Sequence, residues 1–295
     1  MFKTVRVPAS SANLGPGFDT LGLALDLYLA CRFRPASALS IRITGRDAGE
    51  IPRDQSNLVG ETAAKVAGQD LKIELEIDNQ IPLGKGLGSS AAAVVAGVVI
   101  GSEVGGLGWR RERVLQEAAK IEGHPDNVSA CVLGGLTAAA FDDCGLARAV
   151  RLDFPKHFQV AVIVPDFRLA TEKARRVLPN LFSREDAIFN LQRSALLLAG
   201  LASGNRDVFP DALADRLHQP HRFRLVPGLD EITRLRAPGL LGCALSGAGP
   251  SILVFYERGH ESVCELAQHV FSANGHESEV LRTSVDTQGL TISQN

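Results

Sequence analysis

A glycine-rich stretch, Ile81 to Gly97, constrains the fold of this chain more than any other segment. It reads IPLGKGLGSSAAAVVAG, in which three spaced glycines precede a serine pair and a run of small apolar residues. Glycine lacks Cβ and adopts positive φ, so such a loop can turn tightly and point its N–H groups at a ligand. Ser89 or Ser90 is expected to cap a helix over Ala91 to Ile100, whose positive end favours an anion. The stretch therefore predicts a phosphate-binding loop.

Two common phosphate-binding folds do not match this stretch. A Walker A loop reads G-x-x-x-x-G-K-[ST], whereas Lys85 precedes the last glycine here. A dinucleotide-binding fold has a preceding strand that is buried on both faces. The segment Leu71 to Asp78 instead alternates apolar with charged residues, which is typical of a half-exposed strand. A purely structural alternative remains, in which a tight turn precedes a small-residue helix packed closely on a sheet.

Composition narrows the class of protein. A length of 295 residues predicts two domains, and a formal net charge of −2 gives no electrostatic footprint for nucleic acid or an anionic membrane. The N-terminus has no apolar segment of the signal-peptide type, so a cytoplasmic protein without a membrane partner is expected. His218 and His221 lack a third ligand nearby, so no metal site is expected there. Five scattered cysteines predict free thiols of a reducing compartment: Cys31, Cys131, Cys144, Cys243 and Cys264.

The first half of the chain predicts strands and helices in mixed order. Pro8 is expected to end the first strand, and ASSANLGPGFDTLG is expected to form a turn-rich loop. The domain boundary is expected at Asp153 to His157, which gives domains 1–153 and 154–295. The predicted strands are Thr4 to Val7, Leu23 to Phe33, Leu39 to Thr44, Leu71 to Asp78, Leu136 to Phe141 and Ala147 to Leu152. The predicted helices, besides that after the glycine loop, are Asn57 to Ala67, Arg110 to Ile121 and Val128 to Leu133.

The second half predicts a strand, several helices and then a ββαβ unit. This order is typical of a ferredoxin-like domain with extra helices inserted after its first helix, so both halves are expected to be α+β. The predicted strands are Phe158 to Val164, Leu240 to Leu245, Ile252 to Tyr256 and Ser278 to Arg282. The predicted helices are Thr171 to Leu178, Arg184 to Leu201, Val208 to Leu217, Leu229 to Leu235 and Glu261 to Ser272.

Three ordered motifs resemble those of the GHMP kinases, which include galactokinase, homoserine kinase, mevalonate kinase and phosphomevalonate kinase. PLGKGLGSSAAA resembles their phosphate loop, and PASSANLGPGFDTLG and LSGAGPSI resemble their first and third motifs. NLGPGFDTLG, EGHPDNV and the pair TEKAR and HQPHR resemble the homoserine kinase branch. The resemblance covers nearly the whole chain. It implies an α+β, two-domain GHMP kinase fold, with an N-terminal domain like ribosomal protein S5 domain 2 and a ferredoxin-like C-terminal domain.

The resemblance implies an ATP-dependent, Mg²⁺-dependent small-molecule kinase. Its expected reaction is phosphorylation of L-homoserine to O-phospho-L-homoserine in threonine biosynthesis, with a homodimer as one expected assembly. One alternative is another GHMP kinase that acts on a mevalonate- or shikimate-type substrate. A second alternative is a non-catalytic regulator of the same fold that binds a ligand and a protein partner. The intact serine pair, Glu122 and Asp126 argue against the regulator.

The nucleotide side of the expected site is the glycine loop. The resemblance makes Ser90 a magnesium ligand together with a glutamate of the following helix, either Glu122 or its rival Glu117. The alternative for each is a solvated helix glutamate. The turn SGAGP is either a simple hairpin or a second glycine loop that closes the phosphate site. The residues expected to bind ATP are Pro82, Leu83, Gly84, Lys85, Gly86, Leu87, Gly88, Ser89, Ser90, Ala91, Ala92 and Gly247.

Asp126 is the expected catalytic residue. It follows Pro125 in a loop, where its carboxylate is free to act as a general base or to orient the substrate hydroxyl. The alternative is a capping role for the helix that begins at Asn127. By resemblance, Asn13 and Asp19 contact the amino end of the substrate, although both residue types are also common in ordinary turns.

Thr171, Arg175 and Arg222 form the expected clamp for the substrate carboxylate. Thr171 and Arg175 are four residues apart and share a helix face, and arginine binds a carboxylate as a bidentate fork. The alternative is that each arginine is a surface charge. The family pattern, and not the spacing, selects these two over Arg176, Arg193 and Arg224.

Overall fold

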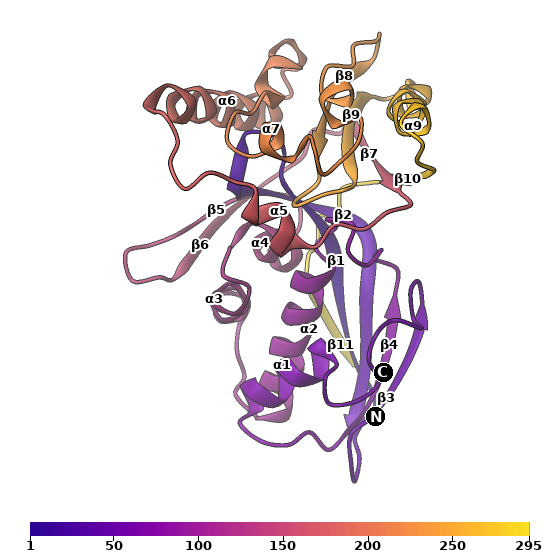
Figure 1. Ribbon diagram of the computed structural model, residues 1–295. Helices are drawn as coiled ribbons and strands as arrows, with labels where there is room; N and C mark the ends of the chain where they lie inside the picture. Colours follow the sequence, from indigo (N-terminus) through magenta and orange to yellow (C-terminus); the bar gives the residue numbers. More distant parts are fainter. Residues whose placement is uncertain (295) are drawn as a thin grey trace.

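Two β-sheets, one for each half of the chain, organise the computed structural model, which describes residues 1–294 (Figure 1). Within these residues the first sheet has seven strands, and its main path runs in the order β11-β1-β2-β4-β3. The β5–β6 hairpin joins it through β2. Its strands are β1 (Lys3–Asn13), β2 (Gly17–Pro35), β3 (Ser40–Gly45), β4 (Ile73–Asn79), β5 (Leu136–Phe141), β6 (Ala147–Leu152) and β11 (Thr291–Gln294).

Helices α1 to α4 pack beside this first sheet (Figure 1). α2 is apolar almost all round, as expected for a helix buried inside a domain. Gly97 and Gly101 let α1 approach it closely, because a Cβ on Gly101 would lie 2.6 Å from the carbonyl oxygen of Ala63. The four helices are α1 (Leu58–Ala67), α2 (Ser89–Val104), α3 (Arg111–Glu122) and α4 (Asp126–Leu133).

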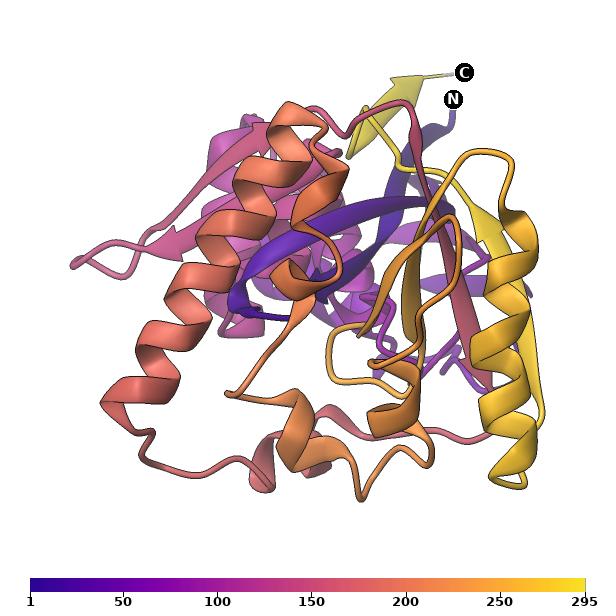
Figure 2. The ribbon, with the colours of Figure 1, turned by 90° about the horizontal axis from the view of Figure 1, so that it is seen from above.

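The second sheet is antiparallel in the order β10-β7-β9-β8. Numbered within this half, that is the order 4-1-3-2 of a ferredoxin-like domain, so the α+β class and the two-domain fold are confirmed. Seen from above, α6 and α9 lie at opposite sides of the view (Figure 2). The strands are β7 (Phe158–Pro165), β8 (Leu240–Leu245), β9 (Ile252–Glu257) and β10 (Ser278–Thr283). The helices are α5 (Thr171–Arg176), α6 (Arg184–Ser203), α7 (Gln219–Arg222), α8 (Leu229–Ile232) and α9 (Cys264–Ala273).

The N-terminal strands differ from the prediction. Pro8 does not end the first strand, because a register shift between Pro8 and Ala9 accommodates the missing N–H and β1 continues to Asn13. β2 begins at Gly17, not at Leu23, so the expected long loop is a short turn between two paired strands. This turn reaches the second domain.

The second half also differs from the prediction, which included no helix at the position of α7 (Gln219–Arg222). The helix predicted over Val208 to Leu217 is absent from the described chain, which has only 3-10 turns at Arg206–Val208 and Asp211–Leu213, because Pro210 interrupts the segment. Strand β11 was not predicted, and it pairs with β1 so that the two chain ends lie near each other (Figure 1). The boundary expected between residues 153 and 154 falls between β6 and β7 and stays a prediction. No helix of residues 1–294 is long and apolar enough to cross a membrane.

Candidate active site

A cleft of about 470 Å³ brings together segments from both halves of the chain. The phosphate loop, the β1–β2 turn and the start of α4 contribute from the first half. α5, the end of α7 and the turn after β8 contribute from the second half. Its lining includes these residues predicted from the sequence: Asn13, Asp19, Pro82, Gly84, Lys85, Gly86, Leu87, Gly88, Ser89, Ser90, Ala91, Glu122, Asp126, Thr171, Arg175, Arg222 and Gly247.

The phosphate loop has the backbone that its glycines predict. Gly84, Gly86 and Gly88 have φ of 66°, 76° and 66°, a region that residues with a side chain rarely adopt. The predicted serine cap is wrong, because Gly88 occupies the cap position of α2 and no side chain caps the helix. The first helical hydrogen bond runs from the Ala92 N–H to the Gly88 carbonyl at 2.8 Å, so the N–H groups before it have no partner within the helix. An anion can accept from these groups.

Segments from both domains support this loop. Ser10 N–H donates to the Leu87 carbonyl at 3.1 Å, and the Ser246 hydroxyl donates to the Gly86 carbonyl at 2.7 Å. Gly247 N–H donates to the Ala12 carbonyl at 3.0 Å. A Cβ on Gly86 would collide with the Ser246 carbonyl, so only glycine fits there. The SGAGP turn therefore packs directly on the phosphate loop.

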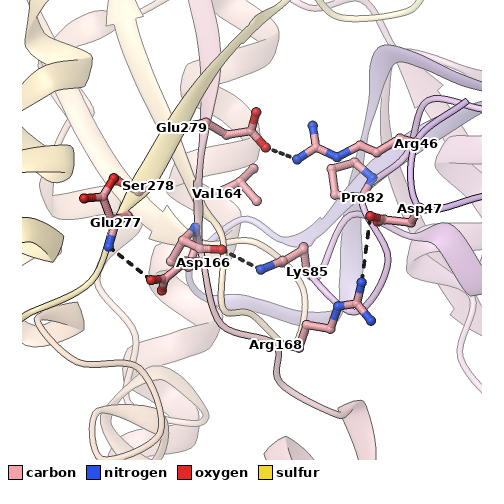
Figure 3. A pocket seen from close by; sticks show the side chains of 11 residues that line it. Arg46, Asp47, Pro82, Lys85, Val164, Asp166, Arg168, Glu277, Ser278 and Glu279 are labelled. Atoms are coloured by element: carbon pink, nitrogen blue, oxygen red, sulfur yellow. Dashed lines mark hydrogen bonds and ion pairs between the residues drawn. The ribbon is translucent and has the colours of Figure 1, made fainter. Parts of the chain in front are cut away.

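The Lys85 ammonium lies at the end of β7, beside Asp166 (Figure 3). It donates to the carbonyls of Pro165, the last residue of β7, and Phe167, at 2.6 and 2.7 Å. Burial and the nearby Arg168 cation lower the pKa of Lys85. Leu83 and Ala92, also expected to bind ATP, do not line the cleft: Leu83 lines an adjoining pocket, and Ala92 is buried in the core.

Ser90 and Glu122 lie together at the start of α2. The Ser90 hydroxyl donates to the Glu122 carboxylate at 2.6 Å. Glu117 instead pairs with Arg113 at 3.2 Å and does not line the cleft. No group of three or more His, Cys, Asp or Glu side chains within residues 1–294 has metal-binding geometry. A hydroxyl and one carboxylate beside a phosphate site nevertheless fit Mg²⁺, which binds few protein oxygens and completes its shell with water and substrate phosphate.

His124 is a cleft residue that was not predicted from the sequence. Its Nδ1 lies 2.8 Å from Asp126 Oδ1, and its Nε2 lies 3.8 Å from Glu122 Oε2. Burial alone lowers the pKa of His124, but the hydrogen bond and charge of Asp126 more than offset this effect, so the pKa lies above its ordinary value. The motif EGHPDN contained the signal, since it puts an imidazole between two candidate carboxylates.

Asp126 is almost fully buried and is the first residue of α4. Its Oδ1 accepts from the Asn127 N–H at 2.7 Å, so a local helix contact does exist. Its other oxygen, Oδ2, has no hydrogen bond within the described chain. The carboxylate therefore keeps one oxygen for a ligand in the cleft.

Arg222 is 1% exposed, yet no carboxylate within residues 1–294 pairs with it inside 4.0 Å. Its Nε donates to the Ala174 carbonyl, and its Nη1 donates to Gly247 O and His218 Nδ1, all at 3.1 Å. No hydrogen bond from Nη2 is found in this part of the chain. Burial and the nearby Arg175 cation lower the pKa of Arg222 to about 10, so the side chain is still cationic near neutral pH.

Arg175 and Asp19 form a bidentate ion pair at 2.8 and 3.0 Å. Asp19 has φ of 52° and Asn13 has φ of 72°, which are uncommon values for residues with a side chain. Asn13 Oδ1 accepts from the Asp19 N–H at 3.0 Å and so fixes the turn. Thr171, the first residue of α5, lines the cleft one helical turn from Arg175.

A smaller, mainly apolar pocket of about 310 Å³ adjoins the cleft. Gly84, Ser89 and Ser90 line both spaces, so the phosphate loop forms the boundary between them. Ile51, Leu58, Val59, Ile77, Leu83 and Ala93 are among the residues around it.

Family models match two parts of the chain. The model "GHMP kinases N terminal domain" matches residues 57–135, which include the phosphate loop, Glu122 and Asp126. The model "GHMP kinases C terminal" matches residues 197–267, which include Arg222 and Gly247. The chain belongs to the GHMP kinase family.

Several relatives that match nearly the whole chain are homoserine kinases. The homoserine kinase of Solibacter usitatus is 61% identical over 98% of this chain and 97% of its own length. The homoserine kinase of Deinococcus radiodurans is 45% identical over 98% of this chain and 96% of its own. The crystal structure of homoserine kinase from Cytophaga hutchinsonii has a TM-score of 0.85 at 29% identity, and covers 99% of this chain and 97% of that one.

Proposed function

We propose that this protein is an ATP-dependent homoserine kinase that transfers the γ-phosphoryl group of ATP to the side-chain hydroxyl of L-homoserine. The observation that carries the substrate assignment is the buried Arg222 guanidinium. Three of its five N–H groups donate to protein acceptors, and the two on Nη2 remain. A buried cation without an anionic partner is costly, so a carboxylate ligand fits this position.

The remaining cleft residues match the other groups of homoserine. The Asp19 carboxylate and the Asn13 side chain would bind its ammonium group, while Arg175 would join Arg222 and Thr171 at the carboxylate. The free oxygen of Asp126 would accept a hydrogen bond from the hydroxyl that attacks phosphorus. In phosphoryl transfer the protein acts mainly by positioning and by stabilising charge, so this orienting role is sufficient.

The phosphates of ATP would accept from the N–H groups of the loop Gly84 to Ala91, at the positive end of α2. Ser90 and Glu122 would hold Mg²⁺, which would supply positive charge to offset the negative charge that develops on the phosphate oxygens. The adjoining pocket of about 310 Å³ has apolar walls and shares three residues with the phosphate site, so it would take the adenine base.

The test replaces Arg222 by leucine and measures Michaelis constants for both substrates. A lost hydrogen bond to a charged group contributes roughly 1.5–3 kcal/mol, so KM for homoserine is expected to rise about 10- to 150-fold, with KM for ATP unchanged. Lysine at this position should restore only part of the affinity, since it keeps the charge and lacks the fork.

Arg224→Leu is the matched control. It makes the same chemical change two residues away, at an arginine that is exposed. Both constants should stay at their original values in that variant. If Arg222→Leu weakened ATP and left homoserine unaffected, the guanidinium would belong to the nucleotide side and the substrate assignment would be wrong.

A further inference from the structure

His218 is a buried histidine with a defined hydrogen-bond role beside the cleft. It is 0% exposed and stacks on Phe18, with ring centroids 5.2 Å apart. Its Nε2 lies 2.7 Å from the Gly15 carbonyl and 3.4 Å from Asp215 Oδ2. A carbonyl and an ionised carboxylate only accept hydrogen bonds, so Nε2 carries the hydrogen.

The other ring nitrogen faces Arg222. His218 Nδ1 lies 3.1 Å from Arg222 Nη1. A guanidinium only donates, so Nδ1 must keep its lone pair and accept. The two contacts together require a neutral imidazole in a single tautomer. Burial lowers the pKa of His218, in agreement with the neutral form.

This contact determines how the guanidinium is oriented. Arg222 Nη1 has two hydrogens, one for His218 Nδ1 and one for the Gly247 carbonyl, while Nε–H is held by the Ala174 carbonyl. With those three fixed, the planar group cannot rotate, and Nη2 is held with its two hydrogens free. The same imidazole binds Gly15, in the turn between Asn13 and Asp19.

We infer that His218 is a positioning residue for substrate recognition: it fixes Arg222 against the turn that carries Asn13 and Asp19. It thereby sets the spacing between the group that binds a substrate carboxylate and the groups that bind its ammonium. This inference rests on the proposed function, because it takes an α-amino acid as the ligand. His218 itself does not line the cleft.

Three variants separate this role from simple packing. His218→Asn retains an acceptor near the position of Nδ1, whereas His218→Gln retains a donor near Nε2 and His218→Leu retains neither. We expect KM for homoserine to rise about tenfold or more in the leucine and glutamine variants, and to recover largely in the asparagine variant. KM for ATP should be unchanged in all three, and thermal unfolding identifies any variant that fails to fold.

A double-mutant cycle supplies the second readout. In the Arg222→Leu background, His218→Leu should add no further increase in KM for homoserine, because its effect acts through that arginine. 3-Amino-1-propanol, which is homoserine without the carboxylate, should have a KM that is unaffected by His218→Leu.

Each other result overturns the inference. If the effects of His218→Leu and Arg222→Leu on KM for homoserine were fully additive, His218 would only support the Gly15 turn. The same conclusion would follow if His218→Gln had the same KM for homoserine as His218→Asn. A folded His218→Leu protein with the original KM for homoserine would remove the role altogether. The proposed function would still stand after any of these results, provided that the original protein phosphorylates homoserine. If the original protein did not phosphorylate homoserine, both the proposed function and the inference about His218 would be wrong.

Discussion

At the scale of single residues, the cleft pairs two charges that the proposed substrate would separate. Arg175 and Asp19 bind each other in two hydrogen bonds. Homoserine is a zwitterion, so its ammonium group would take Asp19 while its carboxylate takes Arg175 and Arg222. A ligand that has only a carboxylate would take Arg175 from Asp19 and leave Asp19 without a partner. A ligand that has only an ammonium group would take Asp19 and leave Arg175 without a partner. Either loss costs binding energy. On the proposed function, the internal ion pair would therefore favour zwitterionic substrates.

Asp126→Asn tests the residue placed at the attacking hydroxyl. The substitution retains the shape of the side chain and removes its charge. We expect turnover to fall by about 10²- to 10⁴-fold if the carboxylate acts as a full base, and by less if it only orients the hydroxyl, with ATP affinity retained. Asp143→Asn, in the exposed turn between β5 and β6, is the control. If Asp126→Asn turned over at the original rate, Asp126 would have no catalytic role, and its function would be limited to the helix contact with Asn127.

His124 makes stability depend on pH. Its pKa in the folded protein is raised above the ordinary 6.5, so protonation favours the folded state. The stabilisation is therefore fully present below pH 6.5, the unfolded value, and is lost as pH rises through the folded pKa.

Urea unfolding of the original protein and of His124→Gln, over about pH 5.5 to 8.5, measures this effect. The difference in free energy of unfolding should be largest at the acidic end and should decline as pH rises above 6.5. A difference that grows with pH would show that Asp126 does not stabilise the protonated imidazole.

At the scale of elements, the phosphate loop depends on glycine at position 88. A Cβ there would meet the Ser10 hydroxyl, and φ is 66°. Gly88→Val should abolish ATP binding, measured by calorimetry. Gly106→Val is a matched control, because Gly106 has the same φ of 66° and open space around it, so the variant has the backbone strain without the collision. ATP binding at the original affinity by a folded Gly88→Val protein would remove the loop from the site.

Lys85 links the phosphate loop to the segment before α5. Its ammonium holds the carbonyls of Pro165 and Phe167, and the Leu169 N–H donates to the Gly84 carbonyl at 3.2 Å, so the loop is joined to the segment that leads into α5. Lys85→Met is expected to raise KM for both ATP and homoserine, because both segments lose a shared contact. An increase confined to ATP would instead indicate a direct contact between the ammonium and phosphate. Steady-state kinetics with each substrate varied in turn distinguishes the two outcomes.

Local patterns predicted the elements whose cause is local. The alternation of Leu71 to Asp78 identified β4, and the three spaced glycines identified a loop whose φ values are positive. The ends of β1 and β2 were missed because Pro8, Gly15 and Pro16 are turn residues by local rules, whereas long-range pairing keeps the strands together. β11 was missed because four mostly polar residues carry no strand signal without their partner, β1.

The cleft was predictable in its residue types but not in its contacts. Motif resemblance selected Arg175 and Arg222. Only the structure shows that Arg175 is paired with Asp19, whereas Arg222 is buried without a carboxylate partner in the described chain. The clearest example is His218, which hydrogen-bonds Gly15 across 203 positions of sequence. No pattern within HQPHR indicates that contact, so an imidazole that the sequence leaves unassigned acquires its role only through tertiary structure.

At the scale of the whole molecule, neither domain builds the cleft alone. The first domain supplies the phosphate loop, Glu122 and Asp126, while the second supplies α5, Arg222 and the SGAGP turn. Direct hydrogen bonds join the two, including the Asn13 amide to the Gly247 carbonyl at 2.9 Å. The position of one domain against the other therefore sets the distance between the phosphate loop and the residues proposed to bind homoserine.

The most direct test of the proposed homoserine kinase activity is a phosphorylation assay with ATP, Mg²⁺ and a panel of acceptors, in which release of ADP is followed and the product is identified by ³¹P NMR. The panel contains L-homoserine, 3-amino-1-propanol, 4-hydroxybutanoate, mevalonate, galactose and shikimate. We expect O-phosphohomoserine as the product and the highest kcat/KM for homoserine, with a much lower kcat/KM for both single-charge analogues. A higher kcat/KM for mevalonate, galactose or shikimate, or ATP binding with no phosphorylated product from any acceptor, would contradict the proposed activity.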